Sequence, residues 1–433
     1  MLRQLTSSLR VTWRDFRTHG RLWIPLGLTS TGTAAAITIL SVFLPVVLAK
    51  FTDSGTLIGF AIGGEGLFAL ALSILIGPLS DRTHTRFGRR RPYILAGVIL
   101  AAACLTLAPL MPSYWSVVGV IFGFFIGYYL IGTPYRALAP DVLAPEHYGR
   151  ALGYQQLLRG VGFIIAFSVG SAIFPWNQFL PFAIVAGVLL FSGLTTVLLV
   201  REPATAKPPL TFRREFRELW RAWRGHAELR KAVLANFLFE ASFAGLRTFV
   251  VLFFLVGMKL PIYWVTIAVG IVAIANVVGS VIIGYLADSF GIRRVLFWSN
   301  LLYAAFLVVP FFWQKLWFVF ALLPPLALVG VGIITLSFPL VMEIIPSGRR
   351  GGYSGIFELA RGLGIVVGPV ATGAAIDLYR HLGGPYEGYP AMWLALSVMS
   401  FLAVLVLRWL GPEPDHGQRR KVEAGYAKAT RAA

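Results

Sequence analysis

Long apolar runs constrain the fold of this chain more than any other feature of its sequence. A helix that crosses a membrane needs about 20 mostly apolar residues, and the 433-residue chain holds seven long runs without a charged side chain. Two of these runs are long enough to cross twice, and three further apolar segments carry few charges, so we expect twelve spans. The runs are Leu22–Ala49, Pro92–Tyr135 (turning near 109–113), Gly160–Val200 (turning near 175–178), Leu260–Ala287, Val295–Gln314, Leu316–Met342 and Gly388–Leu407, and the further spans are 55–79, 231–257 and 353–378.

Composition agrees with a chain that lies mostly in a lipid bilayer. Charged residues make up 13% of it and the mean hydropathy is +0.75, whereas soluble domains carry about 25% charged residues. The sequence holds no nucleophile elbow, phosphate loop or metal-ligand cluster, and its six histidines occupy termini or loops. We therefore expect an all-α integral membrane protein that is not an enzyme and holds no metal or cofactor.

The basic residues predict the orientation. Thirty of the 38 lysines and arginines fall in alternate loops that begin with the N-terminal tail, and only four fall in the opposite loops. By the positive-inside rule both termini are cytoplasmic, in a plasma (inner) membrane. The net charge of +19 is then a consequence of topology, and no nucleic-acid partner is expected. The four opposite residues are Lys50, Lys259, Lys315 and Arg380.

Internal repetition indicates two homologous halves. The segment Gly77–Asp81 (GPLSD) recurs as Gly284–Asp288 (GYLAD) at an offset of 207 residues. Further along, Leu158–Gly162 (LRGVG) recurs as Ala360–Gly364 (ARGLG) at an offset of 202. Four extra residues around Thr83–Arg86 account for most of the change in offset. Matches in the same order are the signature of a repeated unit, here of six helices.

The segment between the halves carries apolar residues at helical spacing. Phe212, Phe216, Leu219 and Trp223 are separated by arginines and other polar residues, which predicts an amphipathic helix on the cytoplasmic membrane surface. The expected units are a cytoplasmic tail 1–21, an N-terminal half 22–200, the linker 201–230, a C-terminal half 231–410 and a cytoplasmic tail 411–433.

Two six-helix halves joined by a linker resemble the major facilitator superfamily, in which substrate sits near the midplane between the halves and access alternates by rocking. The segment Gly284–Arg294 (GYLADSFGIRR) resembles the superfamily's signature loop, with Ser289 where a basic residue is usual. The longer first-half copy, Ser80–Tyr93, and Pro134–Leu138 (PYRAL) followed by Asp141 resemble the sucrose–proton symporters and the wider glycoside–pentoside–hexuronide group. The resemblance implies a monomeric transporter of a small solute, with a sugar as the favoured class.

Glu65 is a candidate proton-coupling residue. Ionisable groups inside spans cost about 2.5–3.5 kcal/mol on insertion scales, so each indicates a function or a partner. Glu65 lies about 24 Å from the cytoplasmic end of its helix, among three glycines. The alternatives are a glutamate that faces the outer vestibule or one paired to an arginine across the bundle. Melibiose-type sodium symporters carry carboxylates where this chain has Ala69 and Ser73, so the resemblance favours protons over sodium.

Three groups of residues are candidates for substrate binding. Glu240 and Arg247 lie on one face of their span, two turns apart and too far to pair directly; Glu240 is also a candidate proton carrier, and an ion pair between helices is the alternative. Glu358 and Arg361 can meet on one helix face. Arg159 is the repeat mate of Arg361, and Gln155 lies one turn before Arg159. A guanidinium fork suits hydroxyl and carboxylate groups, but the repeated Arg-Gly-x-Gly also suits close packing and state-dependent salt bridges.

Charged residues near the cytoplasmic helix ends are candidates for gating. For Arg136 the sucrose-transporter resemblance implies a substrate-linked role, and the superfamily resemblance equally implies a charge network with Asp81. The others are expected to close the cytoplasmic gate by capping helix N-termini or by pairing with each other. The gating candidates are Asp81, Arg82, Arg89, Arg90, Asp141, Asp288, Arg293, Arg294 and Glu343.

Three functions are compatible with these features. The first is proton-coupled import of a disaccharide, oligosaccharide or glycoside, and the second is proton-coupled export of amphipathic compounds on the same fold. The third is a membrane protein that does not transport, such as a sensor or an assembly factor. Fold alone does not separate them. The loop motifs and the polar residues in both halves favour the sugar symporter.

Overall fold

The computed structural model describes residues 2–83, 85, 87–142, 145–200, 202, 227–344 and 350–410. Twelve of its helices are long and apolar enough to cross a membrane, as the sequence predicts. The expected linker helix lies almost wholly outside the described residues. The N-terminal half contains α1 (Leu2–Leu48), α2 (Gly55–Arg82), α3 (Arg91–Leu107), α4 (Tyr114–Val142), α5 (Pro145–Ile173) and α6 (Leu180–Leu199). The C-terminal half contains α8 (Ala227–Leu252), α9 (Ile262–Phe290), α10 (Ile292–Phe312), α11 (Leu316–Ile344), α12 (Arg350–His381) and α13 (Ala391–Arg408).

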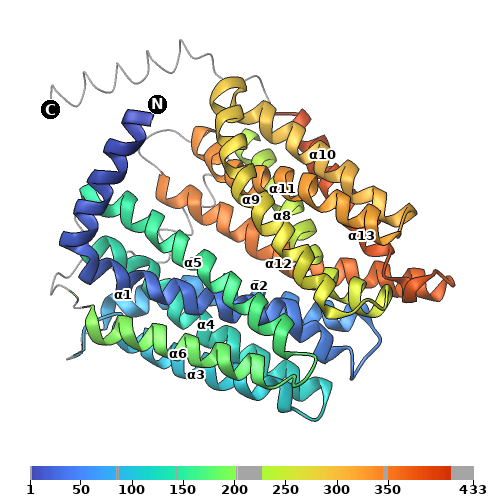
Figure 1. The fold of residues 1–433 in the computed structure, drawn as a ribbon, viewed down its shortest axis with the longest axis horizontal. Coiled ribbons are helices and arrows are strands. Elements are labelled where there is room, and N and C mark those ends of the chain that lie inside the picture. Colours follow the sequence, from blue (N-terminus) through green and yellow to red (C-terminus); the bar gives the residue numbers. More distant parts are fainter. Residues whose placement is uncertain are drawn as a thin grey trace.

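The two halves form separate bundles of the same design. In Figure 1 the blue-to-green helices α1–α6 lie together, and the yellow-to-red helices α8–α13 form the second bundle. Helix α1 packs on α5 and α6, as α8 packs on α12 and α13. Helices are stable in lipid because each backbone polar group finds its hydrogen-bond partner within the same segment. The expected two-half architecture is confirmed.

The tight connections follow the local sequence. Helix α3 ends in a short 3-10 turn, Ala108–Leu110, before α4 begins, and this matches the turn expected near 109–113. Before α6 the side-chain oxygen of Asn177 accepts hydrogen bonds from the backbone N–H groups of Phe179 and Leu180, at 2.8 and 3.1 Å. An Asn side chain that satisfies free N–H groups is a common way to begin a helix, and it lies in the second expected turn.

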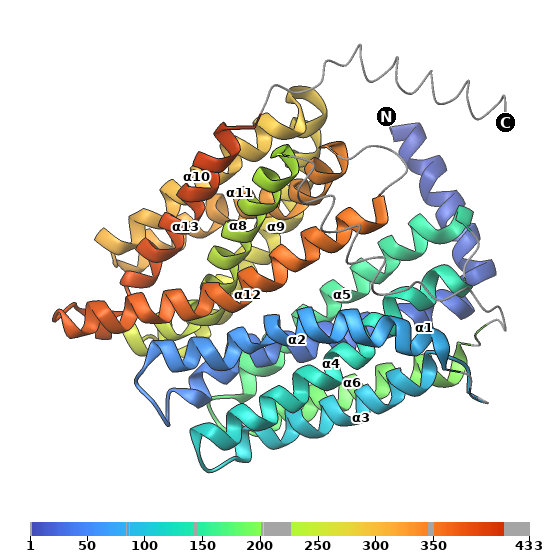
Figure 2. The same ribbon diagram turned by 180° about the vertical axis from the view of Figure 1, so that it is seen from behind.

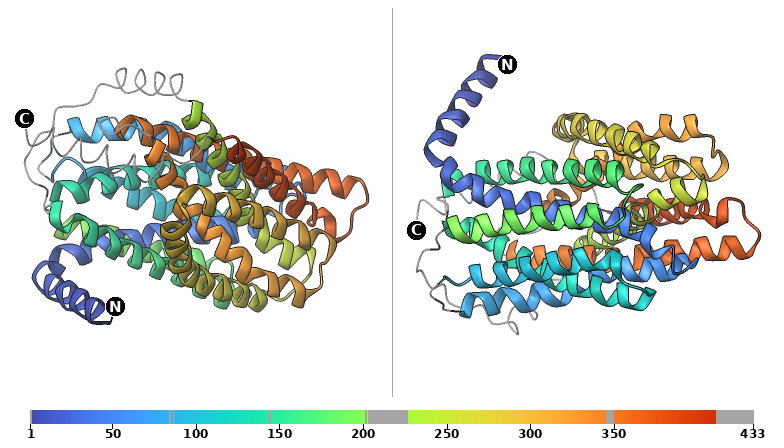
Figure 3. Two further views of the ribbon diagram at one scale, coloured as in Figure 1. Left: turned by 90° about the horizontal axis from the view of Figure 1, so that it is seen from above. Right: turned by 60° about the horizontal axis from the view of Figure 1, so that its bottom comes forward.

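Helix α1 departs from the expected boundary. The chain is helical from Leu2, so residues 2–21 continue the first span as one helix of 47 residues. The apolar part of this helix begins at Ile24, and its first turns project away from the bundle (Figure 3).

Hydroxyl groups join the helices inside each half. In the N-terminal half, Thr29 of α1 and Thr196 of α6 share a hydrogen bond of 2.6 Å. In the C-terminal half, Ser242 of α8 donates to the carbonyl of Leu396 in α13 at 2.9 Å. Within a bilayer such contacts and close backbone packing hold helices together, because burial from water no longer does.

The bundle has two membrane faces, and its halves meet along two seams. The spans begin at Ile24 and end at Arg408 on one side, which we call the terminal face; the loops 49–54 and 382–390 lie on the opposite face. Helices α2 and α12 pack extensively on each other and form the α2–α12 seam, whereas α5 and α9 make the sparser α5–α9 seam. Figure 2 shows α2 and α12 side by side toward the opposite face and diverging toward the terminal face.

Candidate functional site

An ion pair joins the two halves near the middle of the membrane. Glu65 of α2 and Arg247 of α8 lie 2.7 Å apart, with the Glu65 side chain 7% exposed and the Arg247 side chain 28% exposed. The sequence left three readings of Glu65 open, and the structure shows an arginine partner across the bundle. A charge-assisted bond in such surroundings is stronger than one in water, so it ties the halves together.

The glycines around Glu65 explain why it sits at the seam. A Cβ at Gly66 would overlap the carbonyl oxygen of Gly362 in α12, and one at Gly63 would lie 2.9 Å from the carbonyl oxygen of Val366. On another side, a Cβ at Gly64 would lie 2.5 Å from the ring of Phe122 in α4. Helix α2 is thus held closely by two neighbours, and only small residues permit that approach.

Glu240 of α8 is a carboxylate without a direct counterion. Among the described residues it makes no hydrogen bond and no ion pair within 4 Å. Its electrostatic surroundings consist of Arg361 and Arg247, which attract it, and Glu358 and Glu65, which repel it. Its own helix is fixed against α12, since a Cβ at Gly364 would lie 2.8 Å from the Glu240 Cβ. A partly exposed carboxylate in this position can take up and release a proton.

Glu65, Arg247, Glu240, Glu358 and Arg361 form a charge cluster between the halves, and Arg361 lies at its centre. Its Nε donates to Glu358 on the same helix at 3.0 Å, which confirms the expected i, i+3 pair. It also interacts electrostatically with Glu240, with Tyr129 of α4 and with Glu65. Three helices from both halves therefore face this one guanidinium.

Tyr129 belongs to the site although sequence reasoning missed it. The residue is 6% exposed and interacts electrostatically with Glu65, Arg361 and Arg136. It stands in an aromatic-rich span next to Tyr128. No pattern in the sequence separates this tyrosine from those that face lipid.

The candidates on α5 are arranged differently from their repeat mates on α12. The Arg159 guanidinium lies 5.9 Å from the ring centre of Phe163, on its own helix, and within the described chain it makes no ion pair. The Nε2 of Gln155 is buried without a hydrogen-bond partner among the described groups. The sequence treated Arg159 and Arg361 alike, but only Arg361 has a carboxylate three residues earlier, because Glu358 corresponds to Gln156.

Several charged groups inside the spans are open to solvent. The Glu358 side chain is 51% exposed and that of Arg361 is 32% exposed, and both Arg136 and Arg159 are also exposed. Charged side chains within spans face a bundle interior or a water-filled space rather than lipid, so we expect these groups to face the space between helices rather than lipid.

The first-half signature loop is held to the end of α6 by a residue that the sequence did not single out. The Glu202 carboxylate accepts hydrogen bonds from the backbone N–H groups of Arg89 at 2.7 Å, Arg90 at 3.0 Å and Arg91 at 2.9 Å. Gly88 precedes them with φ +104°, a conformation that favours glycine. A carboxylate at a helix N-terminus satisfies the free N–H groups and the helix dipole.

The predicted gate is described only in part. The Arg90 guanidinium donates to the carbonyl oxygen of Pro134 in α4 at 3.4 Å, close to Arg136. In the second half Asp288 and Arg294 are exposed and Arg293 is partly buried. The remaining gating candidates have side chains outside the described part, so their role stays a prediction; they are Asp81, Arg82, Asp141 and Glu343.

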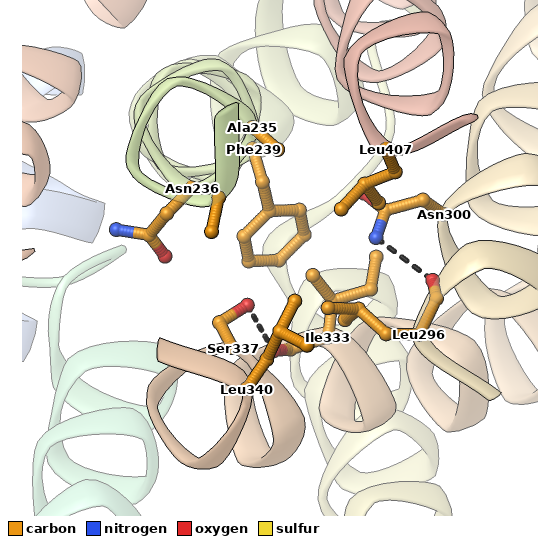
Figure 4. Close-up of a pocket in the computed structure, with 10 residues that line it drawn as sticks. Ala235, Asn236, Phe239, Leu296, Asn300, Ile333, Ser337, Leu340 and Leu407 are labelled. Carbon is orange, nitrogen blue, oxygen red and sulfur yellow. Dashed lines mark hydrogen bonds between the residues drawn. The ribbon is translucent and has the colours of Figure 1, made fainter. Parts of the chain in front are cut away.

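A small cavity lies apart from the charge cluster, inside the C-terminal half (Figure 4). Two of its lining residues, Asn236 and Asn300, each have a buried side-chain atom (Nδ2 and Oδ1) without a hydrogen-bond partner among the described groups. The Phe239 ring stands between these two residues (Figure 4). None of its lining residues is charged; they are Ala232, Ala235, Asn236, Phe239, Leu296, Asn300, Ile333, Ser337, Leu340 and Leu407. It is a packing defect of one bundle rather than part of the inter-half site.

Comparison with known proteins agrees with the architecture. The sequence profile described as Major Facilitator Superfamily matches residues 26–279 and 262–432. An uncharacterized MFS-type transporter, YceJ of Bacillus subtilis, is 22% identical over 387 residues, which cover 84% of this chain and 92% of that protein.

Two shorter matches are to a protein named as a symporter and to one named as a sucrose transport protein. The uncharacterized symporter sll1374 of Synechocystis is 32% identical over 111 residues, and the match spans 23% of this chain and only 19% of that protein. The sucrose transport protein SUC3 of Arabidopsis thaliana is 25% identical over 139 residues, spanning 26% of this chain and 23% of that protein.

Solved structures share the fold. A bacterial homologue of the human lysosomal transporter Spinster, in an inward-facing and occupied conformation, superposes with a TM-score of 0.75 at 17% identity, covering 91% of this chain and 97% of that one. The nucleoside transporter NupG superposes with a TM-score of 0.73 at 17% identity, covering 91% and 99%. Similarity at this level extends to fold alone.

Proposed function

This chain belongs to the major facilitator superfamily, and on that premise we propose that it is a proton-coupled secondary transporter that carries a sugar or glycoside by alternating access. Its relatives and structural neighbours are membrane transporters rather than enzymes. The observation that carries the proposal is the charge cluster between the halves: the Glu65–Arg247 pair joins them, and Glu240 has no direct counterion among the described residues.

Coupling follows from the charges of this cluster. A proton on Glu65 would remove one side of its ion pair with Arg247 and weaken a tie between the halves. A proton on Glu240 would remove its attraction to Arg361 and Arg247 together with its repulsion of Glu358 and Glu65. Since charge inside a membrane protein is costly unless paired or solvated, the movement that buries this site favours a protonated Glu240. Proton binding and access to the site are therefore linked.

Substrate would bind where polar groups of both halves meet. Arg159 with Gln155 on α5 and Arg361 with Glu358 on α12 offer donors and acceptors to a polyhydroxylated ligand. The sugar class is supported by the resemblance of the loop Ser80–Tyr93 and by the partial match to a sucrose transport protein. With both termini in the cytoplasm, the diverging side of α2 and α12 would be open to the cytoplasm.

Uptake into proteoliposomes tests this proposal. With an acid-outside pH gradient, the wild type should accumulate a labelled sugar from a panel of sucrose, maltose and aromatic glucosides. The variant Glu240→Gln should lose gradient-driven accumulation and only equilibrate the sugar, because the neutral amide cannot carry the proton. Glu228→Gln is the matched control, since that glutamate pairs with Lys231 at the surface.

The possible results discriminate between the functions considered. Gradient-driven uptake that Glu228→Gln retains and Glu240→Gln loses supports the symporter. No gradient-driven uptake of any sugar contradicts it. Gradient-driven movement of amphipathic cations instead would assign the protein to the exporters.

A further inference from the structure

One carboxylate of α12 is bonded almost entirely to the start of α2, in the other half. Asp377 Oδ1 accepts the backbone N–H of Gly55 at 2.7 Å. Its Oδ2 accepts the backbone N–H of Thr56 at 2.9 Å, the Thr56 hydroxyl at 2.7 Å and the Ser54 hydroxyl at 2.8 Å. Ser54 also caps its own helix by accepting from Leu57. The free N–H groups at the first turn of α2 are thus satisfied by a carboxylate from across the seam.

A second residue of α12 reinforces this contact. The Arg380 guanidinium donates to the carbonyl oxygen of Asp53, which precedes α2. Its Nε donates to the carbonyl oxygen of Glu387, in the loop before α13, at 3.0 Å. Arg380 also lies 3.9 Å from Asp377. It therefore links the loops 49–54 and 382–390 of the opposite face and holds the Asp377 carboxylate in place.

The backbones touch directly below this contact. A Cβ at Gly55 would lie 2.9 Å from the carbonyl oxygen of Gly373, and one at Gly59 would overlap the carbonyl of Pro369. With Gly63 and Gly66, these glycines let α2 lie on α12 over about three turns. The closed contact extends from the opposite face to Glu65.

The repeat provides an internal comparison. By the offset of 207, Ser54 corresponds to Pro261 at the start of α9, and by the offset of 202, Asp377 corresponds to Pro175. Pro261 makes no side-chain cap of α9, and neither proline supplies a carboxylate or a hydroxyl. The bonds of Asp377 belong to the α2–α12 seam, and the described part of the α5–α9 seam shows no counterpart of them.

We propose that Asp377, held by Arg380, is a latch that closes the opposite face of the molecule, and that release of this cap is the event that opens that face. Opening separates α2 from α12 at this end, so four hydrogen bonds to one carboxylate must break together. The freed α2 N-terminus and the freed carboxylate must then both find water. The inference rests on the alternating-access cycle proposed above.

The distance between the halves on the opposite face tests the latch. In a Cys104→Ala background, spin labels at Trp176→Cys and Lys315→Cys would report it, since both sites are exposed and lie in different halves. Pulsed electron resonance on the protein in nanodiscs should give a mainly short distance without the latch mutation. Asp377→Ala should raise the ratio of long to short distances by tenfold or more.

Two further variants complete the design. Asp53→Ala is the matched control, because it removes a carboxylate from the same face while leaving the Asp53 carbonyl that Arg380 uses. Thr56→Val removes one hydroxyl donor but keeps Asp377, so it should produce a smaller increase in the fraction of long distances. This variant replaces Asp377→Ala in the test if Asp377→Ala does not fold. Distance distributions that stay at the wild-type value in both Asp377→Ala and Thr56→Val would overturn the latch, as would an equal shift in Asp53→Ala. The measurement needs neither substrate nor proton, so its outcome is independent of which solute is carried.

Discussion

The α2–α12 seam and the α5–α9 seam are related by the internal repeat, yet they are built differently. Along α2 and α12 the backbones touch at glycines, as a Cβ at Gly63 would lie 2.9 Å from the Val366 carbonyl. Gly270 is the repeat mate of Gly63, and Gly160 is the repeat mate of Gly362. A Cβ at either of these two positions would meet nothing within 4 Å. The first seam also carries Glu65, Glu358 and Arg361, whereas Arg159 on the second has no carboxylate partner in the described chain.

The difference indicates that helices at equivalent positions in the two halves have different roles. One seam is tight, charged and closed at the opposite face. The other has fewer contacts between its helices, and Gln155 Nε2 on α5 has no hydrogen-bond partner among the described groups. Gene duplication produces two similar bundles, but function depends on residues that have since diverged at matching positions. Breaking each seam separately should therefore have unequal effects.

The largest expected effect comes from removing a charge at the tight seam. Arg247→Ala leaves Glu65 buried and unpaired, which should cost about 3–5 kcal/mol of stability and lower the Tm of the purified protein. Arg159→Ala, on α5, should cost no more than about 1 kcal/mol, because within the described chain Arg159 makes a cation–π contact with Phe163 but no ion pair. Adding Glu65→Gln to Arg247→Ala should restore much of the Tm. Equal Tm losses for the two arginine variants would remove the distinction between the seams.

A medium effect is expected from adding one methyl group. Gly59→Ala places a Cβ against the Pro369 carbonyl, and overpacking of this kind costs about 1–3 kcal/mol. Gly270→Ala meets open space and should be neutral or stabilising, since alanine favours a helix by about 1 kcal/mol over glycine. Thermal unfolding of both variants provides the measurement. A Gly59→Ala protein as stable as the wild type would show that α2 and α12 are not in backbone contact.

The smallest effect is expected at the solvated edge of the tight seam. Glu358→Gln breaks the pair with Arg361, but the glutamate side chain is 51% exposed. An exposed pair contributes about 0–1 kcal/mol, so the Tm should change little, whereas sugar affinity should fall if this residue lines the binding site. A large Tm loss would place Glu358 among the structural residues instead.

The sequence predicted the architecture well, because apolar runs mark the membrane spans and repeated segments mark the two halves. Twelve apolar spans and the turns at 109–113 and 175–178 follow from length and from proline and asparagine positions. The i, i+3 pair of Glu358 and Arg361 follows from helix geometry. Such features depend on neighbours along one helix, which the sequence shows.

For contacts between helices, the sequence predicted the kind of contact but not the partner residue. A partner for Glu65 was expected somewhere across the bundle, but its identity as Arg247 depends on how α2 and α8 are rotated. Asp377 and Glu202 cap helices more than 100 residues away in sequence, and nothing local marks them. Arg159 and Arg361 were predicted as symmetric binding candidates, and that role stays a prediction. Their surroundings differ for a reason visible in the sequence, because Gln156 stands where the second half has Glu358.

The most direct test of the account is whether solute and proton move together through Glu240. On a solid-supported membrane, addition of a transported sugar to proteoliposomes without an imposed gradient should give an inward positive current. That current should grow as the external pH falls, and Glu240→Gln should abolish it while Glu228→Gln retains it. A sugar-induced current of wild-type size and pH dependence in Glu240→Gln would contradict the account.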